Sequence, residues 1–432
     1  MKEIGLGLLG FGTVGAGVVE GLQRNGDLIA SRAGVKLTLR KIADLDLERD
    51  RGVKVDRSML TNDARSVIHD PDIHIIIELI GGVGIARELV IEALKAGKPV
   101  VTANKKLLAE HGAELFALAD EHKVDLRFEA SVAGGIPIIQ ALREGLIANH
   151  IPNIYGILNG TCNYILTRME NEGLPFDQVL KEAQDAGFAE AEPSLDIDGH
   201  DTAHKAALLA SLAYGFPFPL KEMYVEGIRG VAREDIAHAA DMGYRMKLLA
   251  VIKKTDAAVS VRVHPALVPQ SHMLASVSSV FNAVLVSGDI VDDTLYYGRG
   301  AGRLPTASAV ISDIAAVARQ VATQSTRHLP AFIPEGEKPA LESMDDITCK
   351  YYLRVRVADK PGVLARIANI LGEHDISIAT MIQQDVAEAG QAEIIMTTHA
   401  AREKNLREAL AGIDALDITS GKAVRFRIED FA

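Results

Sequence analysis

The sequence predicts an α/β protein with three parts, and three observations lead to this prediction. A glycine-rich turn follows the first apolar segment, and strand-like and helix-like segments then alternate as in a doubly wound parallel sheet. From about residue 136 the pattern changes to segments that are typical of a mixed sheet. The end of the chain has the order βαββαβ, which is the ferredoxin-like order. We therefore expect a parallel-sheet domain at 1–130 with a returning helix at 305–323, an α+β substrate and dimerisation domain at 131–304, a linker at 324–349, and a ferredoxin-like domain at 350–432.

The composition excludes several classes of protein. The 432 residues are 48% hydrophobic and 24% charged, as in soluble globular proteins, and no apolar run reaches the ~18–20 residues that span a bilayer. The net charge of −12 argues against a nucleic-acid partner. Cys162 and Cys349 are the only cysteines, which argues against both a disulfide framework and a zinc site. We expect a cytoplasmic protein with neither a membrane nor a nucleic acid as partner.

The glycine-rich turn predicts a dinucleotide site. Residues 4–9 are typical of a buried parallel strand, and a helix-like segment follows the turn. Between them stand Gly10, Phe11, Gly12, Thr13, Val14 and Gly15, the pattern G-x-G-x-x-G in strand–turn–helix context. The glycines allow a pyrophosphate to approach the backbone, and the helix N-terminus favours its negative charge. A tight turn without a ligand is the alternative.

The second strand leaves the choice between NAD and NADP open. We expect this strand at 36–43, after a polar insertion at 25–34. Asp44 at its end favours NAD, because an acidic residue there bonds the ribose hydroxyls. Arg40, just before it, favours a 2′-phosphate and therefore NADP.

Two further strand ends carry candidate ligand-binding residues. Lys105 follows the short strand at 99–104, and the carboxyl ends of parallel strands face the ligand crevice. Glu129 lies near the end of the strand at 124–132, before a glycine-rich bend whose carbonyls suit a hard cation. A solvated lysine and an ordinary turn are the alternatives.

Residues 187–205 gather carboxylates around one lysine. Asp201 and Lys205 are spaced i,i+4 in an Ala/Leu-rich helix, so they lie on one face. The lysine is a candidate proton donor, and the carboxylates suit a cationic, amine-bearing substrate. The alternative is a solvated ion pair. The carboxylates of this segment are Glu190, Glu192, Asp196, Asp198 and Asp201.

The middle of the chain predicts further elements. A helix is expected at 137–149, and Asn159-Gly160 marks a turn between a strand and a helix. The segments that alternate like strands are 221–230, 248–254, 257–268, 282–289 and 293–302.

The whole chain resembles a bacterial homoserine dehydrogenase with a C-terminal ACT domain. NGTCNYIL, TANK and EASVAGGIP are similar to family segments, and DKPGVLARIANIL resembles the glycine turn of ACT domains. Glu192 departs from the family pattern, which has Asp, Asn or Ser before the proline. The residues that match the family signature are Ala183, Gly187, Pro193, Asp196, Gly199, Asp201 and Lys205.

The resemblance implies reversible NAD- or NADP-dependent interconversion of L-homoserine and L-aspartate 4-semialdehyde, on the route to threonine, methionine and isoleucine. It implies L-threonine as an effector that acts through the ACT domain, and the alternative is a domain that serves only assembly. A homodimer or homotetramer is expected, because an exposed sheet region in the middle domain and the edges of the ACT domain favour partners. Lys205 and Lys105 would be catalytic, and Glu190, Asp196 and Asp201 would bind the substrate. Beyond the turn at Gly10–Gly15, the implied cofactor contacts are Gly187, Gly302 and Lys105. A monovalent cation, usually sodium, would be held by Glu129 and the carbonyls of Val132, Gly134 and Ile136.

Two other functions compete with this one. An acylating semialdehyde dehydrogenase needs a cysteine nucleophile, and Cys162 is the candidate. A non-catalytic sensor would bind ligands in both end domains, but it would not need a proton donor. The lysine and carboxylates of residues 187–205 therefore favour the enzyme.

Overall fold

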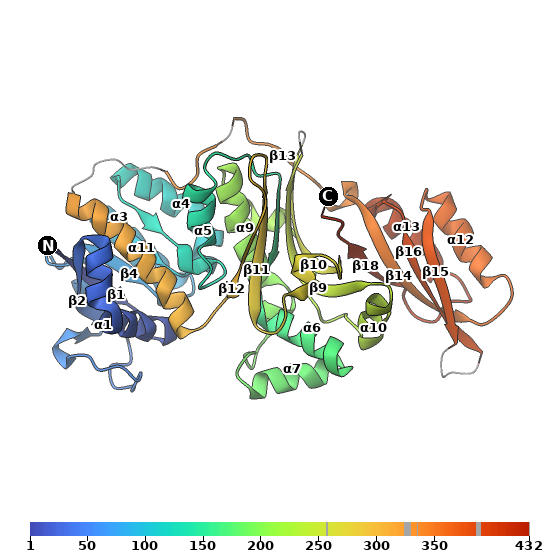
Figure 1. The fold of residues 1–432 in the computed structure, drawn as a ribbon, viewed down its shortest axis with the longest axis horizontal. Coiled ribbons are helices and arrows are strands. Elements are labelled where there is room, and N and C mark those ends of the chain that lie inside the picture. The colour runs from blue at the N-terminus through green and yellow to red at the C-terminus, as the bar shows by residue number, and fades with distance from the viewer. Residues whose placement is uncertain (256–257, 324–329, 335, 386–389, 432) are drawn as a thin grey trace. The chain divides into compact units, whose positions relative to one another are not determined.

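The computed structural model describes residues 1–255, 258–323, 330–334, 336–385 and 390–431 (Figure 1). The chain forms two compact units, which are described separately. The first unit comprises residues 1–160, 201–223 and 280–338, and the second comprises 161–200, 224–279 and 339–432.

A parallel sheet forms the nucleotide-binding part of the first unit. The strand order is β3-β2-β1-β4-β5-β6, and every neighbouring pair is parallel. This is the order of the doubly wound Rossmann fold, so the predicted fold is confirmed. The strands are β1 (Lys2–Leu9), β2 (Val35–Ala43), β3 (Leu60–Thr61), β4 (Ile75–Glu78), β5 (Val100–Thr102) and β6 (Leu126–Arg127).

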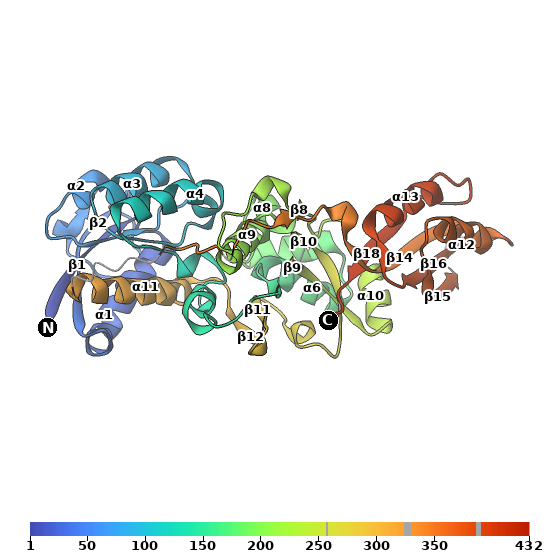
Figure 2. The same ribbon diagram turned by 90° about the horizontal axis from the view of Figure 1, so that it is seen from above.

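Helices cover both faces of this sheet, as Figure 2 shows. On one face lie α2 (Ala64–Ile68), α3 (Gly84–Lys95) and α4 (Lys105–His122), and on the other lie α1 (Thr13–Ala33) and α11 (Arg303–Thr323). The sequences of the strands are continuous apolar runs because both faces of the sheet are buried. Helix α11 contributes Val310 and Ile314 to the same core as Ile4. A Cβ on Gly17 would lie 2.4 Å from the carbonyl oxygen of Arg303, so glycine lets α1 approach α11 closely.

Two predicted boundaries in this sheet are wrong. The polar insertion at 25–34 continues α1, which kinks at Asn25 (φ −120°) and ends at Gly34 in the left-handed region (φ 72°). The strand predicted at 124–132 is paired only over β6, because the chain turns into a 3₁₀ helix at Glu129–Ser131. The bend places Glu129 inside the core.

The first unit also contains an antiparallel sheet with the order β12-β11-β7. Its strands are β7 (Asn153–Ile157), β11 (Phe281–Gly288) and β12 (Asp292–Arg299), and α9 (His200–Tyr214) carries the candidate lysine. The helix predicted at 137–149 forms only α5 (Ile138–Gln140) and a π-helical turn at Ala141–Gly145. Gly145 ends this turn, where a glycine weakens helical continuation.

The second unit begins with helices and continues as a sheet. Its helices are α6 (Gly160–Glu172), α7 (Phe176–Asp185), α8 (Ser194–Ile197) and α10 (Arg233–Asp241), and its strands β8 (Tyr224–Val225), β9 (Tyr244–Lys254), β10 (Ala258–Pro269) and β13 (Ala340–Leu341). The predicted turn at Asn159-Gly160 is confirmed, since β7 ends before it and α6 begins at Gly160. Of the strand predicted at 221–230, only the two residues of β8 form a strand. Within the predicted linker, residues 324–329 and 335 lie outside the described residues.

The predicted ferredoxin-like order is confirmed at the end of the chain. The strand order is β18-β14-β16-β15, and two helices pack with these strands in one core. The elements are β14 (Thr348–Ala358), α12 (Val363–Glu373), β15 (Ile378–Asp385), β16 (Gln391–Thr398), α13 (Glu403–Asp414) and β18 (Val424–Ile428), with the short β17 (Ala401–Arg402) beside β14.

This domain shares a sheet with the strands before it. β18 pairs with β10 in parallel, Ala266 opposite Arg427. The buried carboxylate of Glu429 accepts a hydrogen bond from Arg262 at 2.9 Å. The predicted linker therefore does not leave the ferredoxin-like domain isolated from β9 and β10. Within the described ranges, none of the helices combines the length and the apolar character that a membrane span requires.

Candidate active site

The glycine turn after β1 is built to hold an anion. Gly10 has φ 96°, and a Cβ there would lie 2.6 Å from the backbone of Leu79. A Cβ on Gly15 would lie 2.3 Å from the carbonyl oxygen of Gly10, so the turn closes tightly. Gly12 has open space around its Cα, and α1 begins at Thr13 without a side-chain cap. The first N–H groups of α1 therefore suit a pyrophosphate.

A cavity of about 650 Å³ opens beside this turn, at the carboxyl ends of the strands. Asp44 lines it and accepts a hydrogen bond from the N–H of Phe11 at 2.6 Å. This places Asp44 where the sequence predicted a ribose-binding carboxylate. The glycine turn, the helix N-terminus and the acidic residue together fit a nicotinamide dinucleotide.

Arg40 does not lie at this cavity. Its guanidinium pairs with Glu3 at 3.1 Å, near the amino end of β1, so the geometry argues against its predicted cofactor role. Arg51 contacts the cavity residue Asp44 instead: it pairs with Asp44 at 3.1 Å, its Nε donates to the carbonyl oxygen of Phe11, and its guanidinium stands 4.9 Å from the Phe11 ring centre. No sequence pattern pointed to Arg51, because it lies in an irregular loop without a motif.

One buried carboxylate joins the two candidate lysines. Lys205 donates to Asp201 at 2.7 Å and to the carbonyl oxygen of Leu158 at 2.6 Å. Lys105 lies 3.0 Å from the other oxygen of Asp201, and Asn159 donates to Asp201 at 2.9 Å. Lys205 is only 8% exposed, whereas the Lys105 side chain is 35% exposed. The i,i+4 pair is therefore not a solvated surface pair.

The electrostatics of this cluster follow from burial and the two cations. Burial opposes the charged form of Asp201, but the ammonium groups of Lys205 and Lys105 outweigh it and hold the pKa of Asp201 well below its usual range. Burial also lowers the pKa of the neighbouring His204, against the pull of Asp201. The carboxylate of Asp201, held in its charged form, fixes the ammonium of Lys205 in position.

The ends of β4 and β5 position Lys105. The buried carboxylate of Glu78 accepts from the hydroxyl of Thr102 at 2.6 Å. Asn104 caps α4 and donates to the carbonyl oxygen of Gly82 at 2.7 Å. Lys105 is the first residue of α4 and so stands at the carboxyl edge of the sheet. No sequence pattern pointed to Glu78, Asn104 or Asn159, although Asn159 stood in a predicted turn.

The other signature residues belong to the second unit. Glu190 is exposed and Asp196 half-buried, and Gly187 has φ 75°, which favours glycine. In the first unit, Gly302 has φ 123° and directly precedes α11.

Glu192 takes the place of the shorter residue that the signature prefers. Its carboxylate accepts from the N–H of Ser194 at 3.2 Å and from the hydroxyl of the same residue. These hydrogen bonds lower the pKa of Glu192. α8 begins at Ser194, directly after Pro193, so the helix start forms with Glu192 in place.

Cys162 does not have the surroundings of a nucleophile. It is fully buried in α6, and its thiol donates to the carbonyl oxygen of Asp196 at 3.2 Å. A reactive cysteine needs a partly exposed, electropositive site. This observation argues against the acylating mechanism.

Glu129 caps a helix from inside the core. It is 3% exposed, and its carboxylate accepts from the N–H groups of Ile139 at 2.9 Å and Gln140 at 2.8 Å. Its own N–H donates to Asp313 at 2.7 Å. Burial, with Asp313 nearby, raises the pKa of Glu129 to about 7, and burial raises the pKa of Asp313 to about 6.

The bend after Glu129 fits a monovalent cation through its backbone. Ala133 and Gly134 have φ 54° and 52°, and within the described part of the chain the buried carbonyls of Val132 and Gly134 accept no hydrogen bond. Such oxygens suit a hard cation. The carbonyl of Ile136 instead accepts from Ile138 at 2.8 Å. Among the described residues, no group of three or more His, Cys, Asp or Glu could hold a metal, so carbonyls would supply the ligands.

Comparison with known proteins agrees with this geometry. Residues 10–129 match the NAD-binding domain of homoserine dehydrogenases, and residues 137–315 match the homoserine dehydrogenase domain. Homoserine dehydrogenase from Neisseria gonorrhoeae is 45% identical over 99% of both chains. The chain belongs to the homoserine dehydrogenase family. It is an NAD(P)-dependent oxidoreductase, and residues 351–416 match the ACT domain, which confirms the resemblance seen in the sequence.

Solved structures extend the comparison to the fold. A homoserine dehydrogenase from Thiobacillus denitrificans has a TM-score of 0.94 at 46% identity and covers 100% of this chain and 99% of its own. A hyperthermophilic archaeal homoserine dehydrogenase in complex with NADPH has a TM-score of 0.62 at 28% identity. It covers 73% of this chain and 98% of its own, so the catalytic fold occurs in a shorter relative.

Proposed function

We propose that this protein interconverts L-homoserine and L-aspartate 4-semialdehyde and that Lys205 exchanges the proton at the substrate oxygen. The observation that carries the proposal is the buried cluster in which Asp201 contacts Lys205 at 2.7 Å and Lys105 at 3.0 Å. A non-catalytic sensor would have no use for a lysine held in this way.

The residues of the cluster have distinct roles in this proposal. A bound nicotinamide supplies or accepts the hydride. Reduction of the aldehyde leaves negative charge on its oxygen, and the ammonium of Lys205 donates a proton there. Asp201 keeps Lys205 charged and aligned, and Lys105 adds a second cation that stabilises the developing charge. In the oxidative direction Lys205 takes the proton back.

The substrate ammonium requires a carboxylate that is open to the solvent. Glu190 is exposed and Asp196 half-buried in the signature segment, and both are assigned to substrate binding with Asp201. A panel of substrates tests this assignment. L-Homoserine should be oxidised, whereas 4-hydroxybutyrate, which lacks the ammonium, should show a kcat/KM at least about tenfold lower, because a hydrogen bond to a charged group contributes ~1.5–3 kcal/mol. Equal values would contradict the assignment.

The dinucleotide is assigned to the turn at Gly10–Gly15, with Gly187, Gly302 and Lys105 as further contacts. The open backbone at Gly12 supports the phosphate position. Asp44 suits the ribose hydroxyls of NAD, and Arg51 beside it suits the 2′-phosphate of NADP. The archaeal relative in complex with NADPH supports the use of NADP.

A sodium ion is assigned to the bend after Glu129. The carbonyls of Val132 and Gly134 support this assignment, whereas the carboxylate of Glu129 is engaged by two N–H groups. Glu129 would therefore shape the bend and leave coordination to the backbone.

L-Threonine is proposed as a feedback inhibitor that acts through the ACT domain. Asp359 and Gly362 (φ 87°) stand at the exposed glycine turn before α12. Deletion of 350–432 would not test this cleanly, because it removes β18 from β10 and leaves Arg262 without its buried partner Glu429. A single substitution at the turn is the better test.

Assembly and domain organisation complete the proposal. Tyr297 on β12 is 54% exposed and Met381 on β15 is 40% exposed, and both strands end their sheets. Exposed apolar edges of this kind support a homodimer or homotetramer. We assign the protein to the cytoplasm and keep the domains at 1–130 with 305–323, 131–304 and 350–432.

A further inference from the structure

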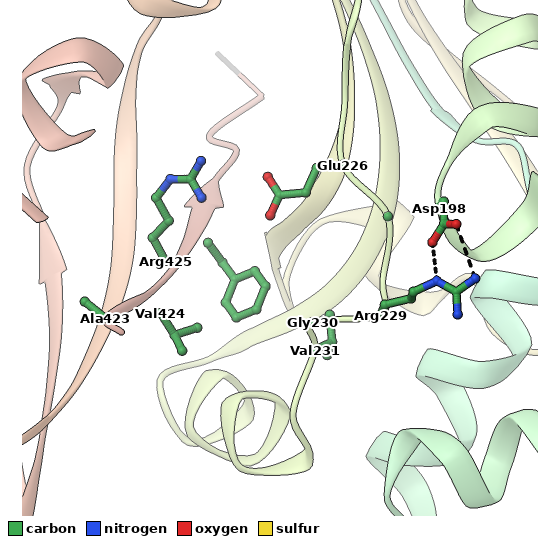
Figure 3. A pocket seen from close by; sticks show the side chains of 10 residues that line it. Asp198, Glu226, Arg229, Gly230, Val231, Ala423, Val424 and Arg425 are labelled. Carbon is green, nitrogen blue, oxygen red and sulfur yellow. Dashed lines mark hydrogen bonds and ion pairs between the residues drawn. The ribbon is translucent and has the colours of Figure 1, made fainter. Parts of the chain in front are cut away.

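A cavity in the second unit lies outside the site described above. It measures about 390 Å³, at the small end of the ~300–1,000 Å³ of small-molecule sites. The loop 226–231 and the residues 423–426 at the start of β18 line it, together with Asp198 (Figure 3). β10 pairs with β18 only at Arg427 and Ile428, so the cavity lies where that pairing is absent.

Opposite charges face each other in this cavity. Figure 3 shows the carboxylate of Glu226 and the guanidinium of Arg425 turned toward one another. Glu226 is held by the hydroxyl of Tyr224 at 2.5 Å and by Arg427 at 3.1 Å, both on its Oε2 atom. Among the residues that the structure describes, Arg425 makes only long contacts through one nitrogen, 3.3 Å to Tyr224 and 3.4 Å to Glu403. Each group therefore keeps polar atoms for a ligand.

Part of the remaining wall of the cavity is apolar. Val424 and Phe426 come from β18, and Val231 comes from the loop. Arg229 also lines the cavity, but its guanidinium turns away and pairs with Asp198. A ligand would thus meet Arg425, Glu226 and a small apolar surface, with the Arg229–Asp198 ion pair beside them.

We propose that this cavity binds a free, neutral α-amino acid. The carboxylate of the ligand would pair with Arg425, its ammonium with Glu226, and its side chain would contact Val424 and Val231. A simple anion would meet the carboxylate of Glu226, and a simple cation would meet Arg425, so only a zwitterion satisfies both groups. Arginine is well suited to bind a carboxylate through two parallel hydrogen bonds.

The loop that lines the cavity is bonded to the signature segment. The N–H of Ile228 donates to the carbonyl oxygen of Ile197 at 2.7 Å, and Arg229 donates to Ser194 at 2.7 Å. A Cβ on Gly227 would lie 2.1 Å from the carbonyl oxygen of Ile197, so glycine is required for this contact. An occupant of the cavity would therefore rest on the loop that supports α8.

Calorimetric titration of the full chain tests the proposal, with L-alanine and L-threonine as probes. Saturable binding is expected, and Arg425→Ala and Glu226→Gln should each weaken it at least tenfold. Arg407→Ala should leave it unchanged, because Arg407 is an exposed ACT arginine paired with Asp345 elsewhere on the domain. Arg425→Lys keeps the charge and serves if the alanine variant unfolds, and it should weaken binding less than tenfold.

Two results would overturn the proposal. One is amino-acid binding that neither Arg425→Ala nor Glu226→Gln weakens. The other is acetate binding as tightly as L-alanine, which would indicate a plain anion site. Asp359→Ala separates this site from the glycine turn proposed for feedback: loss of all binding in Asp359→Ala, with normal binding in Arg425→Ala, would support the turn and exclude the cavity.

Discussion

Replacement of Lys205 by alanine removes the proposed proton donor without stranding a buried charge. Asp201 would still contact Lys105 at 3.0 Å and Asn159 at 2.9 Å. The carbonyl oxygen of Leu158 would lose its donor, which costs about 1–3 kcal/mol of folding free energy. This is less than the ~3–5 kcal/mol expected when a buried ion is left unpaired. The variant should therefore fold.

The expected rise in the activation barrier is larger than the expected loss of folding free energy. A positioned general acid contributes roughly 10²–10⁴ in rate. Each factor of ten corresponds to about 1.4 kcal/mol, so Lys205→Ala should raise the barrier by about 3–5 kcal/mol. The KM for homoserine should change less than kcat, because the proton moves in the transition state.

The assay follows reduced-nicotinamide absorbance with L-homoserine for both the wild-type protein and the variant. Added methylamine should restore part of the turnover of Lys205→Ala, since it replaces the missing ammonium. Lys106→Ala is the matched control, because Lys106 is the exposed neighbour of Lys105 and pairs with Glu110 at 3.9 Å. Its kcat should stay close to that of the wild-type protein.

A kcat of Lys205→Ala within about twofold of the wild-type value, in folded protein, would refute this reasoning. A large loss that methylamine does not restore would also contradict it, because Lys205 would then act as a positioning residue.

Four other outcomes are expected. Arg51→Ala should raise the ratio of the KM for NADP to the KM for NAD about 10- to 100-fold, because a hydrogen bond to a charged group contributes ~1.5–3 kcal/mol. Arg40→Ala should leave this ratio unchanged. An unchanged ratio in Arg51→Ala would show that Arg51 does not bind the 2′-phosphate. Cys162→Ser should keep most of the turnover. A complete loss of turnover in this variant would support the acylating mechanism. Burial raises the pKa of Glu129 to about 7, so its stabilising contribution is present below about pH 4 and is lost as the pH rises through 7. Glu129→Gln should therefore flatten the fall in the free energy of unfolding over this pH range, measured with urea. A fall that persists in Glu129→Gln would show that other groups cause it. L-Threonine should inhibit the wild-type protein but not Asp359→Ala, and equal inhibition would place the effector elsewhere.

Local patterns predicted the site where one element fixes the geometry. The i,i+4 spacing of Asp201 and Lys205 holds in α9, and Lys105 stands at the end of β5 as the strand pattern required. Both predictions rest on the regular geometry of one helix or one sheet edge. The glycine turn was predictable for the same reason, because its spacing determines a backbone shape.

Contacts that irregular loops make, or that join distant segments, could not be predicted in this way. Arg51 reaches Asp44 from an irregular loop, and Asn159 reaches Asp201 from another element. The pairing of β18 with β10 joins residues that are far apart in the chain. Side-chain periodicity describes which face of an element is buried, but it does not identify the partner that covers it.

The most direct test of the central claim is the oxidation of L-homoserine by the purified full-length protein at mildly alkaline pH, with NAD and NADP in parallel. Reduced nicotinamide should accumulate with at least one cofactor, at a rate that depends on homoserine concentration and falls by about 10² or more in Lys205→Ala. Folded wild-type protein that produces no reduced nicotinamide with either cofactor would contradict the account and favour the non-catalytic sensor.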